Sequence, residues 1–187
     1  MKGWYFSPQD CRLAHGDGRL IKAGITHSVS GELELCKNGL HFSVNPLDAL
    51  DYAPSPIVWR VNVFSDIIKS YDKGCARERG YLWGYDATKV LRHFARLCAL
   101  DVVHLWNAPD VAIRFLRTGD ESLRAATRAA ARTATRAAAG TAARNAAGNT
   151  ARTAARDAAR AARDAARAAT REAQNRRLHR MLMEGRP

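Results

Sequence analysis

One stretch in the last third of the chain limits what the protein can fold into. From Arg124 to Arg177 there are 54 consecutive residues without a Leu, Ile, Val, Met or aromatic residue, and 25 of them are Ala and 13 are Arg. An Ala surface offers little area to bury, so this stretch gains little by packing against a folded domain. Ala and Arg both have high helix propensity. The sequence therefore predicts a long helical segment, the Ala/Arg arm (residues 124–177), that extends away from the rest of the chain.

Most arginines of the arm recur at steps of four residues, and they are the candidate binding residues. They are Arg124, Arg128, Arg132, Arg136, Arg144, Arg152, Arg156, Arg160, Arg163, Arg167 and Arg171. The step of three from Arg160 to Arg163 creates a repeat of about 11 residues, whose period of 3.67 fits a nearly straight α-helix. Gly140 and Gly148 interrupt the pattern. We expect either one rod of roughly 80 Å, at 1.5 Å per residue, or a helical hairpin that folds near residues 145–150.

The positive charge of the chain is concentrated in its C-terminal part. Residues 120–187 contain 15 Arg and 6 acidic residues, a net charge of +9, whereas residues 1–119 have 15 Lys+Arg against 12 acidic residues, a net charge of +3. Arginines four residues apart on a helix repel each other by about 0.2–0.5 kcal/mol per pair. An anionic partner removes this repulsion, so we expect the arm to bind nucleic acid or an acidic protein surface. The alternative is a solvated helical spacer without a partner.

Residues 1–119 contain what a small globular domain needs. All four Trp, all five Tyr and all five Phe of the chain lie there, enough for one modest core. Short apolar runs between turn residues predict strands at residues 4–6, 20–22, 33–36, 40–42 and 57–63. Asn38-Gly39 indicates either a hairpin or a tight turn between the third and fourth of these strands.

Three helices are also predicted in this region. Asn45 and Pro46 mark the start of a short helix, because Asn caps free backbone N–H groups and Pro fits the first helical turn. Asp86 is expected to cap a longer amphipathic helix. Pro109 opens the third helix, and Gly119 ends it in the manner of a C-cap.

These patterns predict two parts. Residues 1–119 form an α+β domain with a small mixed sheet and two or three helices, and residues 120–187 form a long Ala/Arg-rich helix or helical hairpin. No stretch approaches ~18 apolar residues, so we expect no membrane span. The N-terminus has no apolar signal-peptide region, and this favours a cytoplasmic location.

Two Cys–His pairs are the candidate metal ligands. Cys11 and His15, together with Cys36 and His41, offer the four soft ligands of a structural zinc site. Neither pair forms a CxxC knuckle, so core thiols and turn histidines are the preferred interpretation, and no metal is expected. The charged residues at 72–73 and 77–79 are interpreted as surface charge.

One run of the sequence resembles a known family. Residues 34–52 read ELCKNGLHFSVNPLDALDY, and a strand-like segment at 58–63 and DKGCA at 72–76 follow. This pattern resembles an uncharacterised domain family of bacteriophages and prophages, whose members share ELCxxG[LF]H, NPLDxLxY and DKxxA elements and often carry a low-complexity repeat. The resemblance covers residues 1 to about 118 and brings no established activity with it. By association it implies an accessory, anti-defence protein in the host cytoplasm, whose front domain docks a host or defence protein.

A second resemblance lies inside the same run. Residues 39–42, followed by a short helix ending in Tyr52, are similar to a strand–helix element of ADP-ribosyltransferases, in which a His, a Tyr and a Glu hold NAD. The resemblance implies that Tyr52 is the stacking Tyr and His15 the His, although no Glu lies in a matching motif. The competing interpretation, which we favour, is that Tyr52 closes a core helix beside the apolar strand at 57–63.

Binding is therefore the preferred functional hypothesis. The front domain would dock a specific partner, the Arg-rich arm would hold DNA or RNA, and no cofactor is expected. The alternative is an ADP-ribosyltransferase-like enzyme that uses NAD and employs the arm for targeting.

Overall fold

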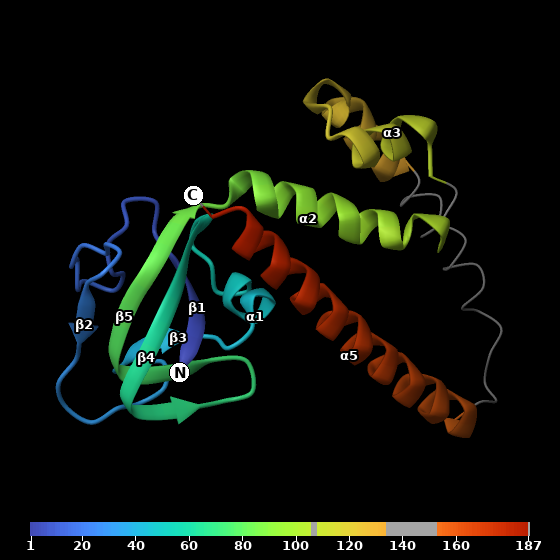
Figure 1. Cartoon of the computed structure of the whole chain (residues 1–187). Helices are drawn as coiled ribbons and strands as arrows, with labels where there is room; N and C mark the ends of the chain where they lie inside the picture. The colour runs from blue at the N-terminus through green and yellow to red at the C-terminus, as the bar shows by residue number, and fades with distance from the viewer. Residues whose placement is uncertain (106–107, 134–152, 187) are drawn as a thin grey trace. The chain divides into compact units, whose positions relative to one another are not determined.

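The structure is a computed structural model that describes residues 1–105, 108–133 and 153–186, with side chains in the last range described from Arg167 onward (Figure 1). Contacts group the chain into two compact units: a sheet unit, Met1–Arg92 with Ala173–Pro187, and a helical unit, His93–Glu172. Composition alone divides the chain after residue 119, whereas these contacts place the C-terminal residues with the N-terminal strands. Among the described residues, no helix has the length and apolar character needed to cross a lipid bilayer.

The sheet unit is built on a five-stranded sheet in the described part of the chain. The strands are β1 (Lys2–Ser7), β2 (Thr26–Ser28), β3 (Leu40–Phe42), β4 (Ile57–Lys69) and β5 (Gly74–Asp86). The order is β1-β4-β5-β2, and β3 pairs with another part of β5. Every pairing is antiparallel, so the α+β class is confirmed but the sheet is not of mixed direction. Short connections such as the β4–β5 hairpin favour antiparallel neighbours.

Three of the predicted strands are confirmed, at 4–6, 40–42 and 57–63, but two are wrong. Residues 20–22 contribute only an isolated bridge between Leu20 and Arg12. Residues 33–36 are not a strand either, because the N–H groups of Lys37 and Asn38 both donate to the carbonyl of Glu34 and close a tight turn. The predicted hairpin is therefore absent, and β3 pairs with β5 instead.

The two faces of the sheet bury different residues. One face forms the main core, and Ile57, Trp59, Val61 and Val63, which alternate along the predicted strand at 57–63, all belong to it. The buried residues of this core are Leu13, Ile21, Leu40, Phe42, Ile57, Trp59, Val61, Val63, Ala76 and Tyr81. The opposite face carries Trp4. In the strand register, Trp4 of β1 lies opposite Arg60 of β4, and Arg60 lies opposite Trp83 of β5. Both faces of this small sheet are therefore used for packing.

A buried polar network lies within the main core. The guanidinium of Arg79 is only 2% exposed, donates from Nε and Nη2 to the hydroxyl of Tyr81 at 3.1 and 2.8 Å, and donates from Nη1 to the carbonyl of His41. It also stacks 3.8 Å above the ring of Tyr5. The Tyr81 hydroxyl lies 3.1 Å from Nδ1 of His27. The interpretation of residues 77–79 as surface charge is wrong for Arg79, whose side chain points to the core face.

The short helix α1 (Pro46–Leu50) begins where the sequence predicts, but its cap is supplied from elsewhere. Asn45 occupies the cap position without a side-chain cap bond, because its Nδ2 donates to the carboxylate of Asp48 at 2.9 Å. The free N–H of Leu47 instead donates to Oδ1 of Asn175 at 2.9 Å. An asparagine 128 positions later in the chain therefore caps this helix.

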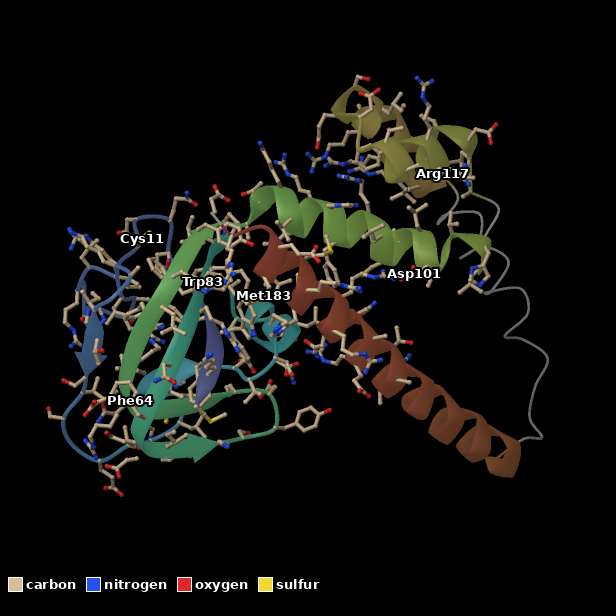
Figure 2. All side chains as sticks on the ribbon, in the orientation of Figure 1. Cys11, Phe64, Trp83, Asp101, Arg117 and Met183 are labelled. Carbon is tan, nitrogen blue, oxygen red and sulfur yellow. The ribbon has the colours of Figure 1, made fainter. Side chains whose placement is uncertain are left out.

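The C-terminal end of the long helix α5 (Thr153–Glu184) packs on the sheet unit. Leu178 and Leu182 are fully buried, and the hydroxyl of Tyr85 donates to the carbonyl of Leu182 at 2.9 Å. The ring of His179 meets the ring of Trp4 edge-on at 5.3 Å. Figure 2 labels Met183 on this end of α5. The helix thus changes from an Ala surface to a Leu surface at its last turns.

The remaining described helices start where the sequence predicts. α2 (Thr88–Asp101) starts after Asp86, whose carboxylate accepts bonds from the N–H and hydroxyl of Thr88. A short 3-10 segment, η1 (Val103–Leu105), follows, and then α3 (Asp110–Thr118). Gly119 ends α3 at a φ of 70° and donates its N–H to Phe115, as a C-cap requires. η2 (Glu121–Leu123) then leads into a helix at residues 124–133.

Candidate functional site

The first candidate site is the start of the Ala/Arg arm. Residues 124–133 are helical, and Arg124, Arg128 and Arg132 are all exposed. Their spacing of four residues places them on one side of the helix. The guanidinium of Arg124 bonds the carboxylate of Glu121 at 3.0 Å on the solvent side. The helix rests on α3, where the Thr127 hydroxyl donates to the carbonyl of Val111 at 3.3 Å.

The other predicted arginines are described to different extents. Arg167 is exposed and Arg171 is half-buried on α5. Arg156, Arg160 and Arg163 lie on the backbone of α5, and their side chains are outside the described part. Arg136, Arg144 and Arg152 lie outside the described residues, as do Gly140, Gly148 and the predicted fold near residues 145–150. A long helix is therefore present at the end of the chain, and the choice between rod and hairpin stays open.

The second candidate site is a group that we call the motif cluster: Cys36, His41, Tyr52, Asp72 and Lys73. The hydroxyl of Tyr52 donates to the carboxylate of Asp72, and Nζ of Lys73 lies 4.7 Å from the centre of the Tyr52 ring. The backbone N–H of Cys36 donates to Nε2 of His41 at 2.9 Å. Two segments of the noted resemblance, residues 34–52 and residues 72–76, thus meet on one side of the sheet unit.

Charge and burial shift the titration of this cluster. The neighbouring thiol of Cys36 raises the pKa of Lys73, and the Tyr52 hydroxyl acts in the same direction. The hydrogen bond to Asp72 raises the pKa of Tyr52. Burial raises the pKa of the nearby Cys75 thiol, with a smaller contribution from Cys36. Lys73 therefore remains a cation and Tyr52 a neutral hydroxyl near neutral pH.

His41 organises the backbone of the cluster. Its Nε2 accepts the N–H of Cys36 at 2.9 Å. Burial lowers the pKa of His41, and the cation of Arg79 lowers it further. A neutral imidazole that accepts this N–H holds the turn at residues 36–41.

The expectation that Tyr52 is a core residue is wrong. Its side chain is 51% exposed, because α1 ends at Leu50 and the following turn directs the ring toward the end of the β4–β5 hairpin. His15, the other weak catalytic candidate, is exposed at a φ of 61°. Within the described residues, no hydrogen bond or ring contact joins His15 to Tyr52.

The four candidate metal ligands are not assembled into a site. In the described ranges, no three or more His, Cys, Asp or Glu side chains are grouped as a metal ion requires. Cys11 is half-buried and packs against the main core, whereas Cys36 is exposed and belongs to the motif cluster. His15 is exposed, His41 accepts the N–H of Cys36, and the four cysteines are free thiols.

Sequence reasoning missed Asp72 and Lys73, which it treated as ordinary surface charge. Their signal was present in the DKxxA element, but the spacing between Tyr52 and Lys73 gives no indication that they meet. The contact depends on the pairing of β3 with β5, which brings residues 40–42 beside residues 74–76.

Comparison with known proteins finds one family model that is similar to part of the sheet unit. Residues 21–93 match a family described as a domain of unknown function (DUF7666). No curated protein and no solved structure matches the chain. The matched segment contains β2 to β5, α1 and all five residues of the motif cluster, and the Ala/Arg arm lies outside it. The resemblances to phage proteins and to ADP-ribosyltransferases stay predictions.

Proposed function

We propose that this protein binds nucleic acid through the arginines of its Ala/Arg arm, as a phage-type accessory protein. The observation that supports this most directly is the exposed row formed by Arg124, Arg128 and Arg132 on one side of a helix. The described neighbours on this helix are mainly Ala and Thr, so the row is not part of an apolar core. Three guanidinium groups at regular steps suit a polyanion better than a single small anion.

Phosphate recognition explains why the arm needs no specific readout. Guanidinium groups on a helix neutralise backbone phosphates and release condensed counterions, which makes binding independent of base sequence and strongly dependent on salt. An acidic protein surface is the other anionic partner considered, but it lacks the regular charge spacing of a phosphate backbone. DNA and RNA both satisfy the proposal, and the binding experiment includes both.

Anchoring of the C-terminal end supports a role beyond that of a free tail. The first residues of the arm follow η2 within the helical unit, and the residues that follow the arm belong to the sheet unit, where Leu178 and Leu182 are buried. Because both ends are attached to folded parts, the arginine-bearing segment loses less conformational freedom on binding than a free peptide of the same sequence.

The test compares two triple variants of the full chain. Arg124→Gln/Arg128→Gln/Arg132→Gln removes three charges from the arm, and the control Lys2→Gln/Lys22→Gln/Lys69→Gln removes three exposed charges from the sheet unit. Affinity for random-sequence duplex DNA and RNA is measured by fluorescence anisotropy between 50 and 200 mM salt, a range chosen from the expected steep dependence of about 0.9 log units per phosphate contact. We expect the arm variant to reduce the slope of log affinity against log salt concentration by about 2–3, and the control to leave this slope unchanged. Equal losses in both variants, or binding without salt dependence, would contradict the proposal.

A second candidate function has one observation in its favour. Tyr52 is half-exposed rather than buried, as a Tyr that stacks on a nicotinamide ring must be, and its hydroxyl is bonded to a carboxylate. We therefore retain as the alternative an ADP-ribosyltransferase-like enzyme that uses NAD and employs the arm for targeting. NAD titration of the native chain and of Tyr52→Ala by calorimetry decides it, because this candidate requires binding in the first and none in the second.

A further inference from the structure

We propose that the buried guanidinium of Arg79 binds a small oxoanion, a carboxylate or a phosphate, through the N–H groups that its neighbours in the fold do not use. The inference does not depend on nucleic-acid binding, because Arg79 lies on β5 and not in the Ala/Arg arm. It rests on the burial of one charge, on the count of its hydrogen bonds and on the side chains that surround it.

Arg79 is a buried cation that has no carboxylate partner among the described residues. Its side chain is 2% exposed. The groups that contact it are the Tyr81 hydroxyl and ring, the His41 carbonyl and the Tyr5 ring, and all of them are uncharged. A buried charge is costly unless an opposite charge pairs with it, and aromatic rings offset only part of this cost. The fold therefore favours an anion beside this guanidinium.

Other arginines of the sheet unit do have carboxylate partners. Nε of Arg77, two residues earlier on β5, lies 2.7 Å from the carboxylate of Asp66. Asp17, whose charge acts on the buried histidine of the network, accepts bonds of 2.7 Å from both Nε and Nη2 of Arg19. Arg77 and Arg19 are both more exposed than Arg79. Within the described part of this network, the most buried guanidinium is thus the one without a counterion.

The hydrogen bonds of Arg79 leave two donors for a ligand. A guanidinium carries five N–H groups. Nε and Nη2 each donate one to the Tyr81 hydroxyl, at 3.1 and 2.8 Å, and Nη1 donates one to the carbonyl of His41. One N–H on Nη1 and one on Nη2 therefore remain. Two N–H groups on neighbouring nitrogens of an arginine suit the paired oxygens of a carboxylate or a phosphate.

The guanidinium lies directly below the surface of the sheet unit. Tyr5 and His41, which contact it, are both half-buried. Side-chain rotations often accompany binding, and a rotation of one of these side chains opens a path for an anion of few atoms. Burial lowers the pKa of His41, and the cation of Arg79 lowers it further, so the imidazole is neutral at neutral pH. The charge that an entering anion meets is therefore that of Arg79.

The experiment measures urea unfolding of the full chain at neutral pH by Trp fluorescence. Sodium phosphate or sodium acetate is raised stepwise, and sodium chloride keeps the ionic strength constant. One anion bound to the folded chain lowers the unfolding constant about tenfold for each tenfold rise in its concentration above the Kd. We expect this slope for at least one of the two salts, and the salt with the lower Kd identifies the oxoanion group. A slope of zero for both overturns the proposal, and this comparison needs no variant.

Two variants separate binding at Arg79 from the general effect of salts on protein surfaces. Arg79→Met removes the guanidinium but keeps an unbranched side chain, and it should abolish the slope. The matched control, Arg77→Met, removes a charge that Asp66 already balances, and it should retain the slope. Equal slopes in the two variants would place the anion elsewhere in the chain and overturn the proposal.

A third variant keeps the test decisive if Arg79→Met does not fold. Tyr81→Phe leaves Arg79 in place and frees the two N–H groups that the hydroxyl accepts. The anion should then bind with a Kd about fivefold lower, which corresponds to one additional net hydrogen bond. An unchanged Kd in this variant refutes the assignment of the anion to Arg79.

Discussion

The sheet unit and the Ala/Arg arm reach their conformations through different forces. Trp4, Val58 and Val63 are fully buried by partners from distant parts of the chain, so the sheet is stabilised by long-range packing. The arm has no comparable side chains, and its helices follow from local propensity. Helix α5 combines both cases. Its Ala/Arg part depends on local propensity, and from Leu178 onward it is stabilised by packing on the sheet unit.

This difference separates stability from binding in the chain. Shortening a single buried side chain lowers the free energy of unfolding of the sheet unit, because the shortened side chain leaves a cavity. The arm has exposed charges that can be changed with little effect on folding, since surface substitutions usually alter stability by no more than about 0.5 kcal/mol. Variants in the two regions should therefore affect different measurements.

The largest expected effect is on the anchor of α5. Leu182→Ala should lower the unfolding free energy of the sheet unit by about 2–5 kcal/mol, because the leucine is fully buried. Chemical denaturation followed by Trp fluorescence measures it. Ala168→Gly, in the exposed part of the same helix, should leave this transition unchanged. If the two variants behave alike, the end of α5 does not belong to the sheet unit.

The next effect concerns the buried network. Tyr81→Phe removes the hydroxyl that accepts two bonds from Arg79, and the guanidinium keeps its burial without those partners. We expect a loss of about 1–3 kcal/mol, the cost of an unsatisfied buried donor. Tyr85→Phe is the matched control, because its half-buried hydroxyl makes one bond, to Leu182. A larger loss in the control would show that the network is less important than the anchor.

A smaller effect is expected at the cap of α1. Asn175→Ala removes the only described side-chain acceptor for the Leu47 N–H and should cost about 1 kcal/mol. Asn45→Ala should cost less, because the side chain at the cap position makes no cap bond. Denaturation midpoints of the two variants measure the difference. A larger loss of stability in Asn45→Ala than in Asn175→Ala would show that Asn45, and not Asn175, caps α1.

These cases also indicate what can be predicted from the sequence. The arm helices, the caps at Asp86 and Gly119 and the strand at 57–63 depend on local patterns and were predictable. β5 was not, because Gly74, Gly80 and Gly84 weaken its strand signal. Gly84 is nevertheless required, since a Cβ there would lie 2.4 Å from the Trp59 ring.

The candidate sites divide in the same way. The exposed row that begins at Arg124 follows from residue spacing along one helix, and the sequence predicts it. The cap from Asn175 and the contact between Tyr52 and Lys73 depend on chain segments that only the folded sheet brings together. No periodicity or local motif carries that information.

The smallest expected effect is a pH dependence confined to the sheet unit. His27 accepts the proton of Tyr81 at Nδ1, because the Tyr81 oxygen already accepts two N–H groups of Arg79. Burial lowers the pKa of His27, the cations of Arg19 and Arg79 add to this, and Asp17 opposes it. The imidazole is therefore neutral in the fold, and its protonation places a second cation in a network without a free acceptor.

The sign of the effect follows from proton linkage. Below the ordinary histidine value of about 6.5, the unfolded chain binds more protons at this position than the folded chain does, so stability is complete above that pH and decreases as the pH falls through it. Burial also lowers the pKa of His41 and His179, which contribute in the same direction. Denaturation at pH 7.5 and 5.5 should show this loss, and His27→Gln should reduce it. No histidine lies between residues 105 and 178, so the helicity of a peptide of residues 120–177 should be the same at both pH values. A peptide that loses helicity in parallel with the sheet unit would contradict the separation of the two regions.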